Sequence, residues 1–332
     1  MTIPTQPIPV ILDVDTGVDD ALAILTAVRH PGIEVLAISC VTGNASLERV
    51  VENTLRVLDV AGAPDIPVAA GAVRPLLAPP RSAGHVHGED GLAGIVLPES
   101  ARVPEPGGAV EMLRRVILGH PQKVTIVALA PQTNLALLLR IHPEVAHNIE
   151  RIVFMGGSAA IGNATAVAEF NVWHDPEAAA AVLDSGVPCF MYGLDVFMRV
   201  AIDETHARRL AESDDPVVAL ARRLLSHRIS FSADEDAVYS GLIGDAGAVC
   251  ALIDPDAVHV EHLPVRVELG GYGRGQTIVD RRPRGGEDIV HGASGGWTTM
   301  DVALNVDADR LANVFLEAIR AGALPPAGSP VP

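Results

Sequence analysis

Short apolar runs alternate with amphipathic stretches from Val10 to Tyr192, and this alternation constrains the fold more than any other feature. The apolar runs are rich in Val and Ile and are bounded by turn residues, as expected of strands buried on both faces. They are Val10–Asp15, Glu34–Val41, Val124–Leu129, Arg151–Met155 and Pro188–Tyr192. The stretches between them have helical spacing; they are Val18–Arg29, Leu47–Ala61, Ala109–Leu118, Thr133–Ile141 and Pro176–Asp184. This order predicts an α/β fold, an open and mostly parallel sheet with helices on both faces.

The C-terminal part of the chain predicts further helices and strands. Helical spacing recurs there, a strand-like run follows, and a helix closes the pattern; these segments are Thr205–Phe231, Asp245–Ile253, His259–Leu269 and Asp309–Ala321. No break in composition separates them from the N-terminal part, so we expect one domain over residues 1–322 and a flexible tail over 323–332. The Pro- and Gly-containing stretch Leu76–Glu105 predicts a long loop or lid.

Charge and composition limit the partners of the protein. With 41 acidic and 24 basic residues, its formal charge of −17 disfavours binding to nucleic acid and to anionic membranes. Lys123 is the only lysine, so a mechanism that needs a catalytic lysine has one candidate. Cys40, Cys189 and Cys250 lie in apolar surroundings without metal-like spacing, as expected of buried thiols in a reducing compartment. Because neither a signal peptide nor a membrane span is recognisable, we expect a cytoplasmic protein.

The first predicted strand and helix are unusually acidic where they meet. The stretch VILDVDTGVDDALAI carries four carboxylates, Asp13, Asp15, Asp19 and Asp20, among apolar residues. A helix dipole offsets at most about 1 kcal/mol per exposed carboxylate, which is too little for several carboxylates at a partly buried place. A hard cation held by carboxylate and carbonyl oxygens would remove the conflict, and such ligands favour calcium or magnesium over zinc. The alternative is a capping cluster of solvated acids.

Polar residues also follow other predicted strands. Thr42–Asn44 follows the second strand, Ala130–Asn134 follows the strand after Lys123, and Met155–Gly157 follows the next one. Ligands of open parallel sheets bind outside the carboxyl ends of the strands. We therefore expect these segments to converge with Asp15 on one edge of the sheet.

Six motifs together resemble one enzyme family. They are DVDTGVDDA from Asp13, VTGN from Val41, HVHGEDGL from His85, LAPQTNLA from Leu129, FMGGS from Phe154 and AEFNVWHDPEAA from Ala168. In sequence and in order they resemble the inosine-uridine preferring nucleoside hydrolases, which remove the base from a ribonucleoside with a tightly held calcium ion. The resemblance implies the α/β fold of that family, a homodimer or homotetramer, and a small-molecule ribonucleoside as partner.

The resemblance implies two sets of site residues in this chain. The Ca²⁺ ligands are Asp15, Asp20, the backbone carbonyl of Leu129 and Asp245. The substrate residues would bind different parts of the nucleoside. The ribose 2′ and 3′ hydroxyls would be held by Asp19, Asn44, Asn171 and Asp245, and the 5′ end by Met155, Asn163 and Glu169. Phe170 could line the pocket, and His87 could approach the base. Carboxylates and amides around a diol select ribose, because a missing hydroxyl leaves a buried partner unpaired.

The implied reaction is hydrolysis of the N-glycosidic bond to ribose and free base. A water bound to calcium is more acidic than bulk water, and Asp15 would take its proton as general base. The surrounding carboxylates would stabilise the positive charge that develops on the sugar.

The chain departs from the family pattern at one position. Many members have a histidine immediately before the last calcium-ligating aspartate, where it helps to protonate the departing base, but this chain has Gly244. His87, His227 and Tyr239 are the remaining candidates for that role. The preferred base and its proton donor therefore stay open.

Two other functions also stay open. LDVDTGV resembles the first motif of haloacid-dehalogenase-type phosphatases, but Gly17 stands where that chemistry has a threonine, and Lys123 lies far from the expected edge of the sheet. The other alternative is a calcium-dependent nucleoside or ribose binder without turnover, because Gly244 removes one possible catalytic aid.

Overall fold

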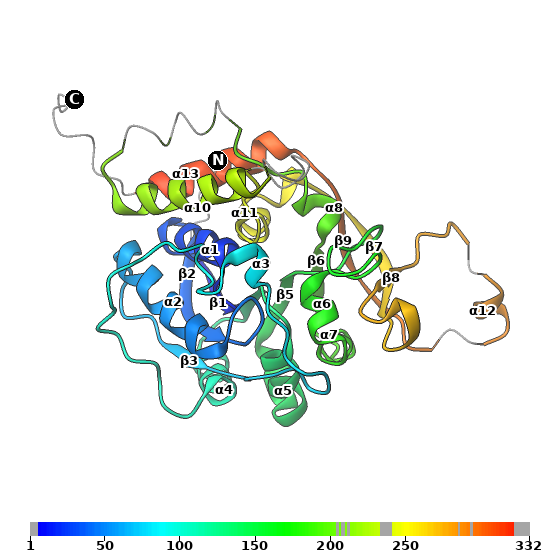
Figure 1. Cartoon of the computed structure of the whole chain (residues 1–332). Coiled ribbons are helices and arrows are strands. Elements are labelled where there is room, and N and C mark those ends of the chain that lie inside the picture. Colours follow the sequence, from blue (N-terminus) through cyan, green and yellow to red (C-terminus); the bar gives the residue numbers. More distant parts are fainter. Residues whose placement is uncertain are drawn as a thin grey trace.

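The computed structural model describes residues 6–203, 206, 210, 213–232, 241–284, 286–292 and 295–321. A nine-stranded sheet runs through it in the order β3-β2-β1-β4-β5-β6-β9-β7-β8 (Figure 1). Its strands are β1 (Ile8–Val14), β2 (Ile33–Cys40), β3 (Val68–Ala70), β4 (Val124–Ala128), β5 (Ile149–Met155), β6 (Cys189–Tyr192), β7 (Val258–Val267), β8 (Thr277–Val279) and β9 (Thr298–Val306). Only the pairings of β7 with β8 and β9 are antiparallel, which confirms the predicted mostly parallel sheet.

Helices cover both faces of the sheet, each over its own hydrophobic core (Figure 1). One face carries α1 (Val18–Arg29), α2 (Leu47–Ala61), α8 (Leu194–Phe197), α10 (Pro216–Ser232), α11 (Ala246–Ile253) and α13 (Ala308–Arg320), and the other carries α4 (Ala109–Gly119), α5 (Thr133–Ile141) and α7 (Pro176–Leu183). Along β1, Val10 and Leu12 pack into the first core and Ile11 into the second, as alternation on a strand requires. Shorter helices are α3 (Gly84–His87), α6 (Phe170–His174), α12 (Glu287–Val290) and the 3₁₀ turns η1 (Pro143–Asn148), η3 (Pro255–Ala257) and η4 (Gly271–Gly273).

The order of the strands indicates that a ligand would bind beside β1. The chain runs from β1 outward through β2 to β3 and then returns to β4, on the opposite side of β1. In such a sheet the crevice lies at the carboxyl ends of the two strands where the order reverses, here β1 and β4. Asp13 pairs in register with Ser39 of β2 and Ala128 of β4, so Asp15 and Leu129 follow neighbouring strand ends.

The predicted lid is a loop that contains one short helix. Between Leu76 and Glu105, only α3 is regular structure. The loop is tied to the body at several points; the Leu76 N–H donates to Asp175 Oδ2 at 2.9 Å, and the Ala83 N–H donates to the Asn44 carbonyl at 3.2 Å. These bonds tie the loop to the residue before α7 and to the segment after β2.

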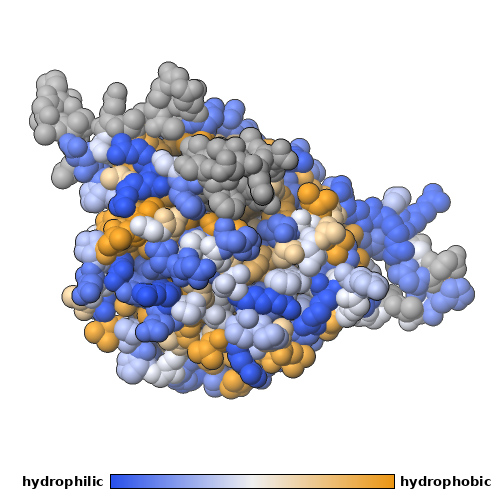
Figure 2. Space-filling model, viewed as in Figure 1, coloured by the Kyte–Doolittle hydropathy of each residue, from blue (hydrophilic) through white to orange (hydrophobic). Residues whose placement is uncertain are grey.

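The character of the surface and of the helices agrees with the strong net charge of the sequence. Figure 2 shows hydrophilic side chains over much of one face, with hydrophobic ones in separate groups. Among the described residues, no helix combines the length and the apolar character needed to cross a membrane. Cys40, Cys189 and Cys250 are buried free thiols, as predicted.

Candidate active site

Asp15 and Asp20 form the centre of the site; Asp15 follows β1, and Asp20 lies in the first turn of α1. Both side chains are fully buried. Asp20 Oδ1 accepts the Asp15 N–H at 3.1 Å, and Asp20 Oδ2 accepts the Gly17 N–H at 3.0 Å. Asn44 joins the two carboxylates, because its Nδ2 donates to Asp15 Oδ1 at 3.0 Å and to Asp20 Oδ2 at 3.2 Å. The end of β2 is thereby fixed to the end of β1.

Burial makes the charges of this pair costly. It raises the pKa of Asp15 well above its usual range, with a further rise from the charge of Asp20, and it also raises the pKa of Asp20. Two buried carboxylates in contact are stabilised by a shared proton or by a cation between them. The pair therefore has the electrostatic character of a cation site.

Gly43 allows Asp15 to lie against the second loop. A Cβ atom at Gly43 would stand 1.9 Å from Asp15 Oδ2, a separation that no packed structure allows. The neighbouring Asn44 N–H donates to the same oxygen at 2.7 Å. The glycine of VTGN is thus required by the close approach of a carboxylate.

Asp13 lies on β1, two residues before Asp15, and is held by hydrogen bonds from two other elements. Its Oδ1 accepts the Ser39 hydroxyl at 2.5 Å and Asn134 Nδ2 at 2.9 Å, while its Oδ2 is buried without a hydrogen-bond partner among the described residues. Burial raises the pKa of Asp13 to about 7. Asn134 Nδ2 also donates to the Cys40 carbonyl at 3.0 Å, so Asn134 connects α5 to β1 and β2.

Asn171 and Glu169 organise the opposite side of the site. Asn171 Nδ2 donates to the carbonyls of Leu129 at 2.9 Å and Met155 at 3.1 Å, which joins the ends of β4 and β5. The Glu169 carboxylate accepts the N–H groups of Gly157 and Asn171, both at 3.0 Å, and thereby caps α6. Burial raises the pKa of Glu169 to about 7.

The remaining predicted substrate residues lie around these groups. Asn163 Oδ1 accepts the Phe170 N–H at 2.9 Å, so the 158–169 loop is fixed to α6. Asp19 is buried in the first turn of α1. Asp245 is buried at the N-cap position of α11, next to Gly244, whose Cα faces the Asp19 carboxyl group.

His87 reaches the site from the lid. Its Nδ1 accepts the Val18 N–H at 3.3 Å, and its ring is buried. Burial, followed by the charges of His227 and His85, lowers the pKa of His87 to about 4, so its imidazole is neutral at pH 7. His227 Nε2 lies 3.3 Å from the Val86 carbonyl, next to α3, whereas Tyr239 lies outside the described residues.

The structure brings some of the predicted residues together and leaves others apart. Asp15, Asp20 and Asn44 make one unit, and Leu129, Met155 and Asn171 make another. In the part of the chain that is described, no three His, Cys, Asp or Glu side chains are arranged to hold a metal ion. Asp245 lies at the N-cap position of α11, and its place among the cation ligands stays a prediction.

Two supporting residues, Ser39 and Asn134, have no predicted role. Both are fully buried polar residues that bond Asp13. The signal for Ser39 is a hydroxyl in the otherwise apolar end of β2, and Asn134 is the one amide of LAPQTNLA that is fully buried. Their contacts with Asp13 depend on which strands are neighbours and in which register they pair, and a sequence motif carries no information about either.

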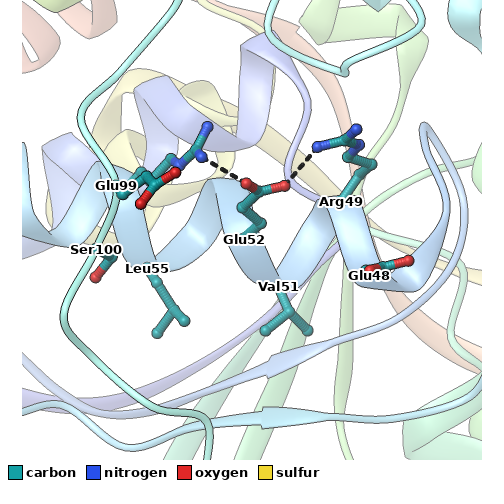
Figure 3. Close-up of a pocket in the computed structure, with 8 residues that line it drawn as sticks. Glu48, Arg49, Val51, Glu52, Leu55, Glu99 and Ser100 are labelled. Atoms are coloured by element: carbon teal, nitrogen blue, oxygen red, sulfur yellow. Dashed lines mark hydrogen bonds and ion pairs between the residues drawn. The ribbon is translucent and has the colours of Figure 1, made fainter.

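A groove on α2 is unrelated to this site. It has a volume of about 490 Å³ and is lined by α2 and by Glu99 and Ser100. Figure 3 shows Arg49 and Glu52 paired on its wall. Glu52 forms ion pairs with Arg49 at 2.7 Å and with Arg56 at 2.5 Å. None of the active-site residues described above lines the groove.

Buried carboxylates and amides at the carboxyl edge of a parallel sheet define a class of α/β site suited to a cation and a polyhydroxylated ligand. The inosine-uridine preferring nucleoside hydrolase family matches residues 10–313. The pyrimidine-specific ribonucleoside hydrolase RihA of Salmonella paratyphi B is 42% identical over 275 residues, 82% of this chain and 88% of that protein. RihA of Citrobacter koseri is 41% identical over the same share. The chain therefore belongs to the inosine-uridine preferring nucleoside hydrolase family.

Solved structures agree with this membership. A plant nucleoside hydrolase, PpNRh1, has a TM-score of 0.86 at 28% identity, covering 95% of this chain and 99% of its own. A purine-preferring ribonucleoside hydrolase from Gardnerella vaginalis has a TM-score of 0.85 at 29% identity, covering 94% and 98%. The predicted family, fold and enzyme class, an N-glycosyl hydrolase of ribonucleosides, are confirmed.

Proposed function

We propose that the protein hydrolyses pyrimidine ribonucleosides to ribose and free base, using Ca²⁺ held at the Asp15–Asp20 pair. The observation that carries the proposal is the buried unit of Asp15, Asp20 and Asn44 at the β1/β4 crevice. The choice of base is supported by the pyrimidine-specific relatives at 42% identity, against 29% for the purine-preferring structure.

The donor set fits a hard divalent cation. Asp15 and Asp20 supply carboxylate oxygens, and the Leu129 carbonyl and Asp245 would complete the set of oxygen ligands. No thiolate or imidazole belongs to this set, so calcium suits it better than zinc. The raised pKa values of Asp15 and Asp20 support the proposal, because a cation between them would replace the proton that burial favours.

The protein groups would share the work of hydrolysis. Asp15 would accept the proton of the attacking water at one carboxylate oxygen. Asp19, Asn44, Asn171 and Asp245 would hold the ribose hydroxyls and fix C1′ for attack. When bound, the cation supplies Lewis-acid activation of water. The negative charge of these carboxylates would stabilise the oxocarbenium-like sugar in the transition state.

Other expectations are kept as part of this proposal. A cytoplasmic location, a homodimer or homotetramer, and one domain over residues 1–322 stay predictions. The phosphatase alternative has lost its support, because the match over residues 10–313 is to nucleoside hydrolases. A binder without turnover is the function to be tested against.

Initial rates on a panel of nucleosides test the proposed reaction and base. With calcium present, we expect ribose release from uridine, cytidine, inosine, adenosine and guanosine, with kcat/KM for the better pyrimidine at least about tenfold above that for any purine. A purine optimum would contradict the choice of base. Binding of these nucleosides without any ribose release would contradict hydrolysis and favour the binder.

A further inference from the structure

Gly244 and Asp19 are in unusually close contact. Gly244 lies at φ +59°, and a Cβ atom built on it would stand 2.6 Å from Asp19 Cγ and 2.7 Å from Asp19 Oδ2. The Asp19 carboxyl group thus occupies the space that a side chain at position 244 would fill. Non-glycine residues rarely adopt this backbone conformation, and packed Cβ atoms do not approach other atoms so closely.

The backbones on both sides of this contact are held in place. Asp19 lies between Val18, whose N–H bonds His87, and Asp20, which accepts the N–H groups of Asp15 and Gly17. On the other side, the Ile243 N–H donates to the Val200 carbonyl at 3.1 Å, and the Gly244 carbonyl accepts the Gly247 N–H at 2.9 Å. Neither segment is free to retreat, so a side chain at position 244 would have to displace the carboxyl group of Asp19.

We propose that Gly244 is a positioning residue for Asp19 and that this contact sets the selectivity of the enzyme for ribose over deoxyribose. The inference rests on the proposed function, in which Asp19 holds a ribose hydroxyl. The family resemblance implies a histidine at this position in many members, whereas in this chain the Asp19 carboxyl group lies against Gly244. The residue at position 244 thereby affects how the enzyme binds the sugar, through the placement of Asp19.

The variant Gly244→Ala tests the proposal through the sugar. The selectivity ratio is kcat/KM for uridine divided by kcat/KM for a deoxy analogue. The experiment measures it for 2′-deoxyuridine and for 3′-deoxyuridine. For the analogue that lacks the hydroxyl held by Asp19, we expect the ratio to fall by about tenfold or more. KM for uridine should rise more than kcat falls. If the activities on uridine and on both analogues fall by the same factor, or if nothing changes, the proposal is wrong.

Gly186→Ala is the matched control. Gly186 has a similar φ of +80°, lies in the turn between α7 and β6, and has no atom within 4 Å of its built Cβ. Alanine therefore has to adopt a left-handed backbone there too, but without a collision. We expect this variant to keep the selectivity ratio of the unmodified protein.

Thermal unfolding provides a readout that does not need turnover. Gly244→Ala should lower Tm more than Gly186→Ala does. The excess should disappear in an Asp19→Gly background, because Asp19 Cβ, itself 2.8 Å from the built Cβ, is then removed together with the carboxyl group. If the excess persists in that background, the contact does not hold Asp19 and the inference fails. Failure of the proposed function is distinguishable, because the unmodified protein would then release no ribose from any nucleoside.

Discussion

Asp15→Ala is expected to lower kcat for ribose release by about 10³-fold or more, the largest effect of any single substitution at the site. A general base alone contributes 10²- to 10⁴-fold in typical enzymes. Asp15 has two roles in the proposed mechanism, as proton acceptor and as ligand of the cation. Steady-state rates on the best nucleoside measure the loss, and Asp15→Asn, which keeps the size of the side chain, should lose a comparable amount.

Two comparisons make this result specific. Asp184→Ala removes a carboxylate whose only described ion pair is the exposed one with Arg140, and it should leave kcat unchanged. Asp19→Ala should chiefly raise KM, because Asp19 binds the sugar and does not accept the proton. Equal and small effects of Asp15→Ala and Asp19→Ala would contradict the roles assigned to both residues.

Gly43→Ala is expected to lower kcat by at least about 10²-fold. The added methyl group would stand 1.9 Å from Asp15 Oδ2, so the carboxylate has to move. A displacement of about 1 Å of a catalytic group typically costs that much in rate. The same displacement should weaken the binding of the cation. A smaller rise of Tm on addition of calcium would measure this loss of affinity.

Gly119→Ala is the control for this substitution. Gly119 ends α4 and has no atom within 4 Å of its built Cβ, so alanine there should change neither the rate nor the response to calcium. If Gly43→Ala keeps a rate within about twofold of the unmodified protein, catalysis does not require Asp15 to lie against Gly43.

The regular parts of the fold were predictable because each carries its own periodic signal. The helices α1, α2 and α5 begin and end at the predicted residues. In contrast, β3 and β8 have three residues each, too few for a period to show, and β9 has partly exposed positions along its length, so its hydrophobic pattern is broken. The predicted helix Thr205–Phe231 holds from Pro216 onward as α10, and most of the residues before Pro216 lie outside the described part.

The centre of the site was predictable because it is local in sequence or marked by a motif. Asp15 and Asp20 are five residues apart, and Asn44 follows the neighbouring strand. Ser39 and Asn134 could not be predicted, because their contact with Asp13 depends on which strands become neighbours and in which register. The start of α7 was also predictable, since Asp175 accepts the Ala178 N–H as an N-cap before Pro176.

Glu169 shows how far a motif can define a role. The resemblance gives it to the 5′ end of the substrate, and in the structure its carboxylate accepts the backbone N–H groups of Gly157, Asn171 and Val172. Those bonds fix the loop after β5 and the start of α6, from which Asn171 reaches Leu129 and Met155. Its contact with substrate stays a prediction.

Ribose release from uridine and cytidine, before and after removal of calcium with a chelator, tests the central claim most directly. We expect release with calcium, loss of nearly all of it after chelation, and recovery when calcium is added back. Release that is unaffected by complete chelation would contradict a cation at the Asp15–Asp20 pair as part of the mechanism. Absence of release from every nucleoside with calcium present would contradict the hydrolysis itself.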